Sequence, residues 1–203
     1  NFDIDGIVEQ YEEKYSNFKF LGSSPIDFRK TKAGTCVLKL FMPESKESKW
    51  LKYKKNSDHC DFNPIAYSGK NIFGIIFNTD VHTGGGRHWM ALYINIEKSI
   101  ILFFDSAVTY RHLHPEIKSF IDNIKEQYPE KNFTFKYNTI QHQQSNSECG
   151  MYSIYFILTM LDADQNNFSS LKAFDIYFNN SGKTVTDKLM VLYRTKLFRE
   201  CDC

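Results

Sequence analysis

The sequence lacks the features that mark several large classes of protein. Its 25 basic and 24 acidic residues leave a formal charge of +1, so it has no basic excess of the kind that binds nucleic acid or anionic membranes. No apolar run approaches the roughly 18 residues that a membrane-spanning helix needs, and the start of the chain carries no signal-peptide pattern. We therefore expect no nucleic-acid partner and no membrane association.

Metal-binding, disulfide and phosphate-binding patterns are missing as well. The five cysteines form an odd, irregular set without CxxC pairs, which is typical of free thiols in a reducing compartment. His112 and His114 form an HxH pair, but no second pair of ligands lies near it in the sequence, which favours an exposed loop over a zinc site. The glycine run 84–86 does not fit the GxxxxGK[ST] pattern and no helix follows it, which favours a flexible hairpin turn. We predict neither a metal nor a cofactor.

What is present indicates a globular protein that mixes helices and strands. Of 203 residues, 42% are hydrophobic and 16% are aromatic, which is enough for one substantial core. Apolar periodicity predicts helices over 2–18, 115–128, 149–161 and 186–198, and strands over 36–41, 73–77, 88–97, 100–105 and 133–140. A turn is expected at 22–25 and a polar connection over 162–184. We predict an α+β fold in which a central mixed sheet is flanked by helices.

Cys149 stands where polar turn residues give way to the apolar run 154–158. This pattern indicates that the cysteine opens a buried helix. Unpaired backbone N–H groups and the positive end of the helix dipole at that point lower the pKa of a thiol toward its thiolate form. Buried structural cysteines are more common than reactive ones, so a nucleophile needs partners elsewhere in the sequence.

His88 and Asp105 are the candidate partners. His88 begins one strand-like stretch and Asp105 ends the next apolar run, with a hairpin connection at 97–99 between them. Neighbouring strands with these residues at equivalent ends bring imidazole and carboxylate into contact, which supplies the base and the orienting group that a cysteine protease needs. Gln143, six positions before Cys149, has an amide N–H that can reach a developing oxyanion together with the backbone N–H of the cysteine.

The active-site motifs of the ubiquitin-like-protein (SUMO) proteases, a family of cysteine proteases, resemble three stretches of the chain: His88-Trp89, Phe104-Asp105-Ser106 and Gln143-x5-Cys149-Gly150. The layout of residues 71–89 and 193–199 is most similar to the viral branch of this family, which includes the polyprotein-processing protease of African swine fever virus and giant-virus relatives. Asp105 follows the cellular pattern, because the swine-fever enzyme has Asn at this position. Either residue can orient a histidine.

The resemblance implies a papain-like, SUMO-protease-type fold with the nucleophile at the N-terminus of a buried helix. In this family the Trp after the catalytic His helps to form a narrow tunnel that only a Gly-Gly tail can pass, so Trp89 is expected to bind substrate. Asn146 and Asn78 are further candidates for holding the main chain of the substrate. Trp50, in the lysine-rich stretch 43–55, fits either a solvated face or a substrate-facing surface.

The function implied by the resemblance is a cysteine endopeptidase that cleaves after Gly-Gly. Two substrate classes stay open, namely viral polyproteins and host proteins that carry ubiquitin, SUMO or a related modifier. A catalytically inactive module that only binds Gly-Gly tails is disfavoured, because a module of this kind does not need all four of His88, Asp105, Gln143 and Cys149. For a viral enzyme we expect the host-cell cytoplasm or the virion as the location. We divide the chain into an N-terminal helical, substrate-facing region, 1–60, and a protease domain, 61–203, packed as one compact unit.

Overall fold

A five-stranded mixed sheet forms the centre of the structure, a computed structural model that describes residues 2–30, 69–109, 113–181 and 185–198. The strands follow one another across the sheet in chain order: β1 (Phe18–Pro25), β2 (Ile72–Asn78), β3 (Trp89–Asn95), β4 (Ile100–Phe104) and β5 (Thr134–Tyr137). The pairs β2–β3 and β3–β4 are antiparallel, while β1 runs parallel to β2 and β5 runs parallel to β4. The predicted α+β class with a central mixed sheet is confirmed.

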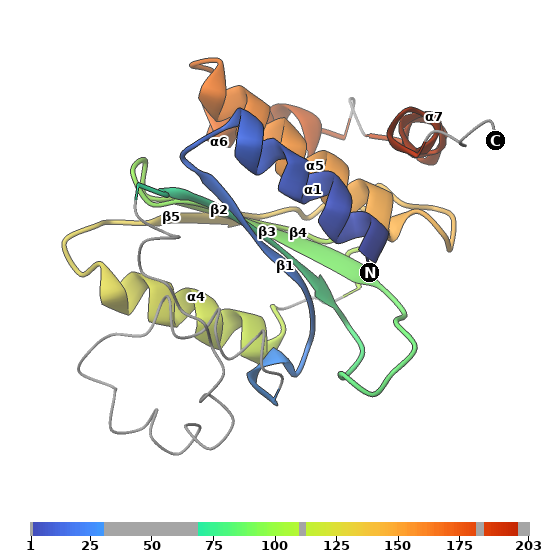
Figure 1. Cartoon of the computed structure of the whole chain (residues 1–203), viewed down its shortest axis with the longest axis horizontal. Coiled ribbons are helices and arrows are strands. Elements are labelled where there is room, and N and C mark those ends of the chain that lie inside the picture. The colour runs from blue at the N-terminus through green and yellow to red at the C-terminus, as the bar shows by residue number, and fades with distance from the viewer. Residues whose placement is uncertain (1, 31–68, 110–112, 182–184, 199–203) are drawn as a thin grey trace.

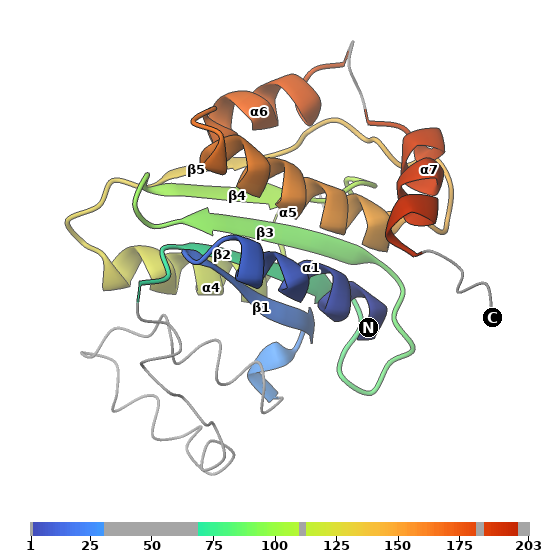
Figure 2. The same ribbon diagram turned by 45° about the horizontal axis from the view of Figure 1, so that its top comes forward.

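Helices cover both faces of this sheet (Figure 1). The long helix α5 (Cys149–Gln165) lies on one face with α1 (Phe2–Lys14) beside it, and α6 (Ser170–Tyr177) and α7 (Asp187–Leu197) pack on α5 from the outside. Helix α4 (Pro115–Gln127) covers the opposite face, and a short 3-10 helix, η1 (Phe28–Lys30), follows β1 (Figure 2). Within the described ranges, no helix is both long and apolar enough to cross a membrane.

Each face of the sheet has its own hydrophobic core. On β2, Ile72 and Ile76 join the core beneath α5, whereas Phe73, Ile75 and Phe77 join the core beneath α4. Successive residues of a strand point to opposite faces, so one buried strand serves both cores. Helix α5 is buried along most of its length, which confirms the predicted buried helix that begins at Cys149.

The sequence predictions differ from the structure in the N-terminal part and near the end of α5. The first helix ends at Lys14, and the stretch with the predicted turn at 22–25 belongs to β1. A register shift between Phe20 and Ser23 and the positive φ of Gly22 (85°) mark a β-bulge, which explains the turn-like sequence of this strand. The predicted connection 162–184 contains the end of α5 and all of α6. The predicted strand 36–41, Trp50 and the domain boundary at residue 60 lie outside the described residues.

Gly74 on β2 allows α5 to approach the sheet closely. A Cβ atom at this position would lie 3.1 Å from Cγ2 and 3.3 Å from Cδ1 of Ile157. We expect Gly74→Val to lower the free energy of unfolding by about 1–3 kcal/mol, because added atoms in a packed core force neighbours to shift. Urea denaturation measures the change.

Gly6 on α1 provides the matched control, since no atom lies within 4 Å of a Cβ built there. Gly6→Ala should raise the free energy of unfolding by about 0.5–1 kcal/mol, because alanine is favoured over glycine inside a helix. Equal unfolding midpoints for Gly74→Val and the unmodified chain would contradict the close approach of α5.

Candidate active site

The structure brings His88 and Asp105 together at one end of the sheet. His88 directly precedes β3 and Asp105 directly follows β4. The two strands are antiparallel, as the predicted hairpin requires, with Ala91 opposite Phe104. Their ends therefore meet, and Nε2 of His88 lies 2.6 Å from Oδ1 of Asp105.

Hydrogen bonds hold Asp105 in place. Its carboxylate accepts the backbone N–H groups of Ala107 (3.0 Å) and Thr109 (2.7 Å) in addition to the imidazole. The buried side chain of Asn138, which follows β5, clamps the backbone of Asp105: it accepts the N–H at 2.9 Å and donates to the carbonyl oxygen at 2.8 Å. No sequence pattern indicates this role of Asn138, because an asparagine after a short strand is not distinctive.

Cys149 is the first residue of α5, and its thiol is hydrogen-bonded to His88 and to the backbone N–H groups of Trp89 and Gly150. Burial raises the pKa of the thiol, but these hydrogen bonds and the charge of His88 outweigh burial and hold the pKa below its ordinary value. For His88, burial lowers the pKa, but the hydrogen bonds and charges of Asp105 and Cys149 raise it to about 9. Each group thus stabilises the charged form of the other, which favours a thiolate beside an imidazolium.

An open pocket of about 590 Å³ gives access to Cys149. Trp89 and Asn146, both predicted to bind substrate, line this pocket, and Ile4 from α1 and Phe198 after α7 form its apolar part. The N-terminal helix therefore contributes to the pocket. The amphipathic pattern of residues 2–18 predicts packing for this helix and gives no sign of that contribution.

Asn78, the third predicted substrate-binding residue, lies behind the glycine-rich loop. Its buried side chain accepts the backbone N–H groups of Asp80 (2.8 Å) and Arg87 (3.4 Å) through Oδ1, and it lines a neighbouring pocket of about 290 Å³. A Cβ on Gly86, whose φ is 85°, would lie 2.8 Å from Nδ2 of Asn78. Asn78 thus shapes the loop before His88, and its contact with substrate stays a prediction.

Gln143 is buried in the loop 143–148, which leads into α5. Its side-chain Nε2 donates to the carbonyl oxygen of Ser145 at 2.6 Å, and its Oε1 accepts the hydroxyl of Ser106 at 2.7 Å. It is not among the described residues that line the pocket of Cys149. One of its two amide N–H groups is thus engaged, and its predicted contact with an oxyanion stays a prediction.

Helix α7 holds the loop 143–148 from outside. Oδ2 of Asp187, the first residue of α7, accepts the backbone N–H groups of Gln144 (3.0 Å) and Ser145 (2.9 Å). Its Oδ1 accepts the hydroxyl of Tyr152 on α5 at 2.9 Å. A single carboxylate therefore ties the loop to both helices, which no sequence pattern around residue 187 indicates.

Arg194 on α7 pairs with Glu148, the residue before Cys149. Nη2 and Nε of Arg194 lie 2.9 and 3.2 Å from Oε2 of Glu148, whose side chain is 8% exposed. An unpaired carboxylate next to Cys149 would disfavour the thiolate, because two negative charges would share a poorly solvated site. Arg194 neutralises that charge.

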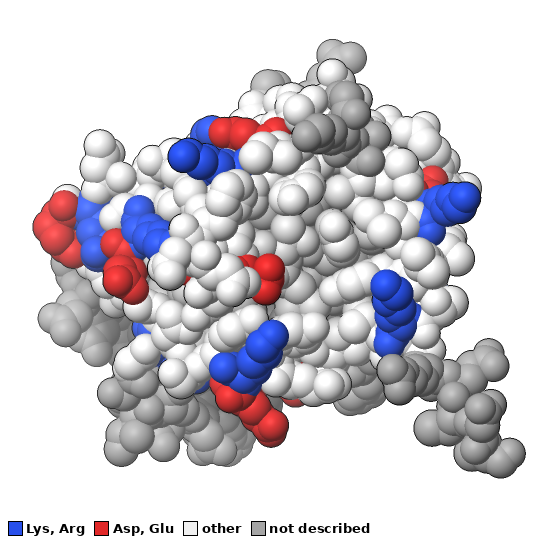
Figure 3. Space-filling model, turned by 90° about the horizontal axis from the view of Figure 1, so that it is seen from above, with Lys and Arg blue, Asp and Glu red and all other residues white. Residues whose placement is uncertain are grey.

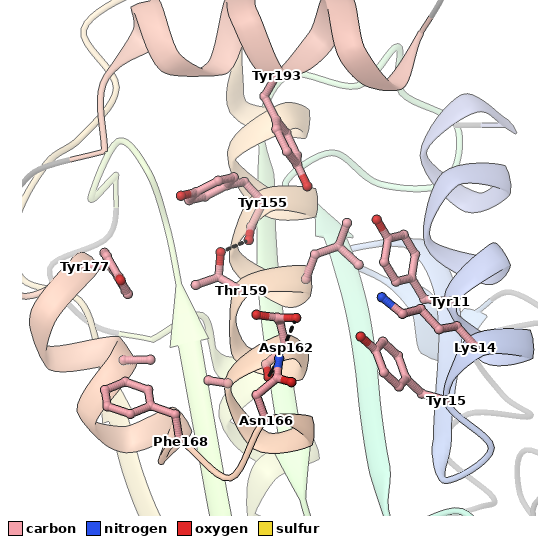
Figure 4. A pocket seen from close by; sticks show the side chains of 13 residues that line it. Tyr11, Lys14, Tyr15, Tyr155, Thr159, Asp162, Asn166, Phe168, Tyr177 and Tyr193 are labelled. Atoms are coloured by element: carbon pink, nitrogen blue, oxygen red, sulfur yellow. Dashed lines mark hydrogen bonds between the residues drawn. The ribbon is translucent and has the colours of Figure 1, made fainter.

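A second pocket, of about 440 Å³, lies on the outer helical side of the molecule (Figure 4). Tyrosines from α1, α5, α6 and α7, and from the position directly after α1, line it: Tyr11, Tyr15, Tyr155, Tyr177 and Tyr193. Figure 3 shows that Lys, Arg, Asp and Glu are sparse over the middle of this side. The described lining contains no cysteine or histidine, so this second pocket lacks the groups that lie together at Cys149 and His88. In the described ranges, no cluster of three potential metal ligands occurs either.

Known proteins resemble the chain over most of its length. A model of the C-terminal catalytic domain of the Ulp1 protease family matches residues 39–195. A "SUMO-1 cysteine protease" of African swine fever virus is 29% identical over 207 residues, covering 98% of this chain and 67% of the viral protein. A protein of Acanthamoeba polyphaga mimivirus named as a thiol protease is 29% identical over 190 residues, covering 88% of this chain and 55% of its own.

The crystal structure of an African swine fever virus protease has the same fold, with a TM-score of 0.63 at 24% identity. The match covers 98% of this chain and 66% of the viral one. The chain thus spans about two thirds of the length of the swine-fever relatives and just over half that of the mimivirus relative.

The contact between Cys149 and His88 predicts that the thiol of Cys149 reacts at lower pH than the thiol of an ordinary cysteine. Alkylation of Cys149 by iodoacetamide follows the thiolate population, so its rate should rise through a pKa below that of an ordinary cysteine. In His88→Ala the rise should move to higher pH, since the hydrogen bond and the charge of His88 then no longer offset the effect of burial on the thiol pKa. Mass spectrometry of the labelled peptide measures the pH profile of alkylation in the unmodified chain and in His88→Ala. If the two profiles coincide, His88 does not lower the pKa of Cys149.

Removing Arg194 should expose the effect of Glu148 on the thiol. We expect Arg194→Met to move the alkylation profile of Cys149 to higher pH and to lower the free energy of unfolding by about 1–3 kcal/mol, because it leaves a buried carboxylate unpaired. The double variant Glu148→Gln, Arg194→Met removes both charges and should restore the profile. If the single variant keeps the original profile, Glu148 does not act on the thiol.

Proposed function

Because the chain belongs to the Ulp1 protease family, we propose that it is a cysteine endopeptidase with Cys149 as nucleophile, His88 as acid–base group and Asp105 as the residue that orients the imidazole. The observation that carries the proposal is the contact of 2.6 Å between His88 and Asp105, beside a cysteine thiol whose pKa is lowered. The pocket that reaches Cys149 supplies access for a peptide.

The proposed reaction begins with attack of the Cys149 thiolate on the substrate carbonyl carbon, which moves the π electrons onto oxygen. The backbone N–H of Cys149 lies in the first turn of α5, where N–H groups have no intrahelical acceptor, and it stabilises this oxyanion together with the second amide N–H of Gln143. Each such donor contributes about 3 kcal/mol. His88 gives its proton to the leaving amine as the C–N bond breaks, then takes a proton from the water that hydrolyses the thioester.

We propose a Gly-Gly pair as the sequence that precedes the cleaved bond. Trp89 narrows the pocket next to the nucleophile, since its Cδ1 lies 3.7 Å from a Cβ built on Gly150. The glycines 85 and 86 line the same pocket. A residue without a side chain passes such a constriction most easily. Asn146 is the proposed main-chain contact on the pocket wall.

For the substrate we propose a viral polyprotein, cut in the host cytoplasm or the virion without a nucleic-acid or membrane partner. The similarity of residues 71–89 to the viral branch of the family supports this choice. The second candidate is the removal of a ubiquitin-like modifier from host proteins. It is favoured by the name of the swine-fever relative, which calls that protein a SUMO-1 protease.

Matched substrates separate the two candidates. We expect cleavage of Gly-Gly-X peptides after the second glycine, a large loss of kcat/KM for Gly-Ala-X peptides, and no turnover by Cys149→Ala with an unchanged circular dichroism spectrum. Ubiquitin and SUMO that carry a C-terminal electrophile are tested in parallel. A fast adduct of one intact modifier with Cys149 would assign deconjugation instead, and inertness toward every probe would contradict both candidates.

A further inference from the structure

The side-chain amide of Gln143 must be turned one way round to stabilise an oxyanion. Its nitrogen donates hydrogen bonds and its oxygen only accepts them, so a reversed amide would repel the developing charge. Gln143 is 5% exposed, and solvent therefore contributes little to its orientation. Neighbouring protein groups must set it.

One neighbour selects the orientation of the amide, and a second one helps to hold it there. The carbonyl oxygen of Ser145 can only accept, so its contact of 2.6 Å requires Nε2 of Gln143 at that end of the amide. At the other end the hydroxyl of Ser106 donates to Oε1 at 2.7 Å. A reversed amide would place two oxygen acceptors face to face at Ser145. The hydroxyl of Ser106 pairs the oxygen that would otherwise be buried without a donor.

Ser106 also anchors the backbone on which Gln143 lies. Its carbonyl oxygen accepts the backbone N–H groups of His142 and Gln143, each at 2.9 Å. Ser106 is 1% exposed and directly follows Asp105, the partner of His88. Of the two consecutive residues after β4, Asp105 thus contacts the imidazole of His88 and Ser106 contacts the amide of Gln143.

We propose that Ser106 is a positioning residue that holds the Gln143 amide in its donating orientation, an inference that rests on the proposed peptidase function. Another support of this loop, Asp187, contacts the loop through the backbone N–H groups of Gln144 and Ser145. Those bonds leave the Gln143 side chain able to rotate. Without the Ser106 hydroxyl, Oε1 is unpaired in a buried site, and the contact with Ser145 alone holds the amide less firmly.

The test compares Ser106→Ala in two backgrounds. With a Gly-Gly-X peptide we expect kcat to fall about 10- to 100-fold and KM to change little, because an oxyanion donor acts mainly on the transition state. In the Gln143→Ala background, the same substitution should cause no further loss. Alkylation of Cys149 by iodoacetamide passes through no oxyanion, so its pH profile should stay unchanged.

Thermal unfolding checks that Ser106→Ala folds. If it does not, Ser106→Cys keeps the side-chain size with a weaker donor and should give a smaller loss of kcat that again disappears in the Gln143→Ala background. An equal loss in both backgrounds would overturn the proposal, as would a shifted alkylation profile. A wild-type protein that is alkylated rapidly but cleaves no peptide would overturn the peptidase function, and with it this role of Ser106.

Discussion

The packing of α5 on the central sheet fixes where Cys149 lies. Gly74 lets α5 settle on β2, so Cys149, its first residue, reaches the end of β3 where His88 is located. The contact between His88 and Asp105 depends on the pairing of β3 with β4 in the same sheet. One rigid core therefore determines all three positions, which is how a site keeps the precise geometry that its chemistry needs.

Charged groups hold α5 on the sheet at both of its ends. At its start, Cys149 is paired with His88. Near its end, the buried carboxylate of Asp164 accepts hydrogen bonds from Tyr93, Asn95 and Lys98, each at 2.8 Å. Burial raises the pKa of Asp164, but these donors and the charge of Lys98 outweigh it and lower the pKa below its ordinary value. The helix is thus held in one register along β3, because sliding would unpair buried charge at both ends.

The sequence predicts those parts of the site that depend on neighbouring elements. Two apolar runs joined by a short turn predict the strands that bring His88 and Asp105 together, and the change from polar to apolar residues predicts the start of α5. Ser106, Asn138 and Arg194 act through contacts between segments far apart in the chain, where local periodicity carries no information. The bulged strand β1 is not predicted from the sequence for a related reason. Its pairing with β2 depends on backbone groups rather than on alternating side chains.

Helix α7 is itself positioned by α5, the helix that carries Cys149. Tyr193 packs edge-on against Tyr155 of α5, with ring centroids 5.1 Å apart at 90°. Burial raises the pKa of Tyr193 to about 12, so its ring stays neutral in this contact. The next residue, Arg194, then reaches Glu148 beside the nucleophile. Since α5 also sets the position of Cys149, one helix places both the thiol and the cation that neutralises the acidic neighbour of the thiol.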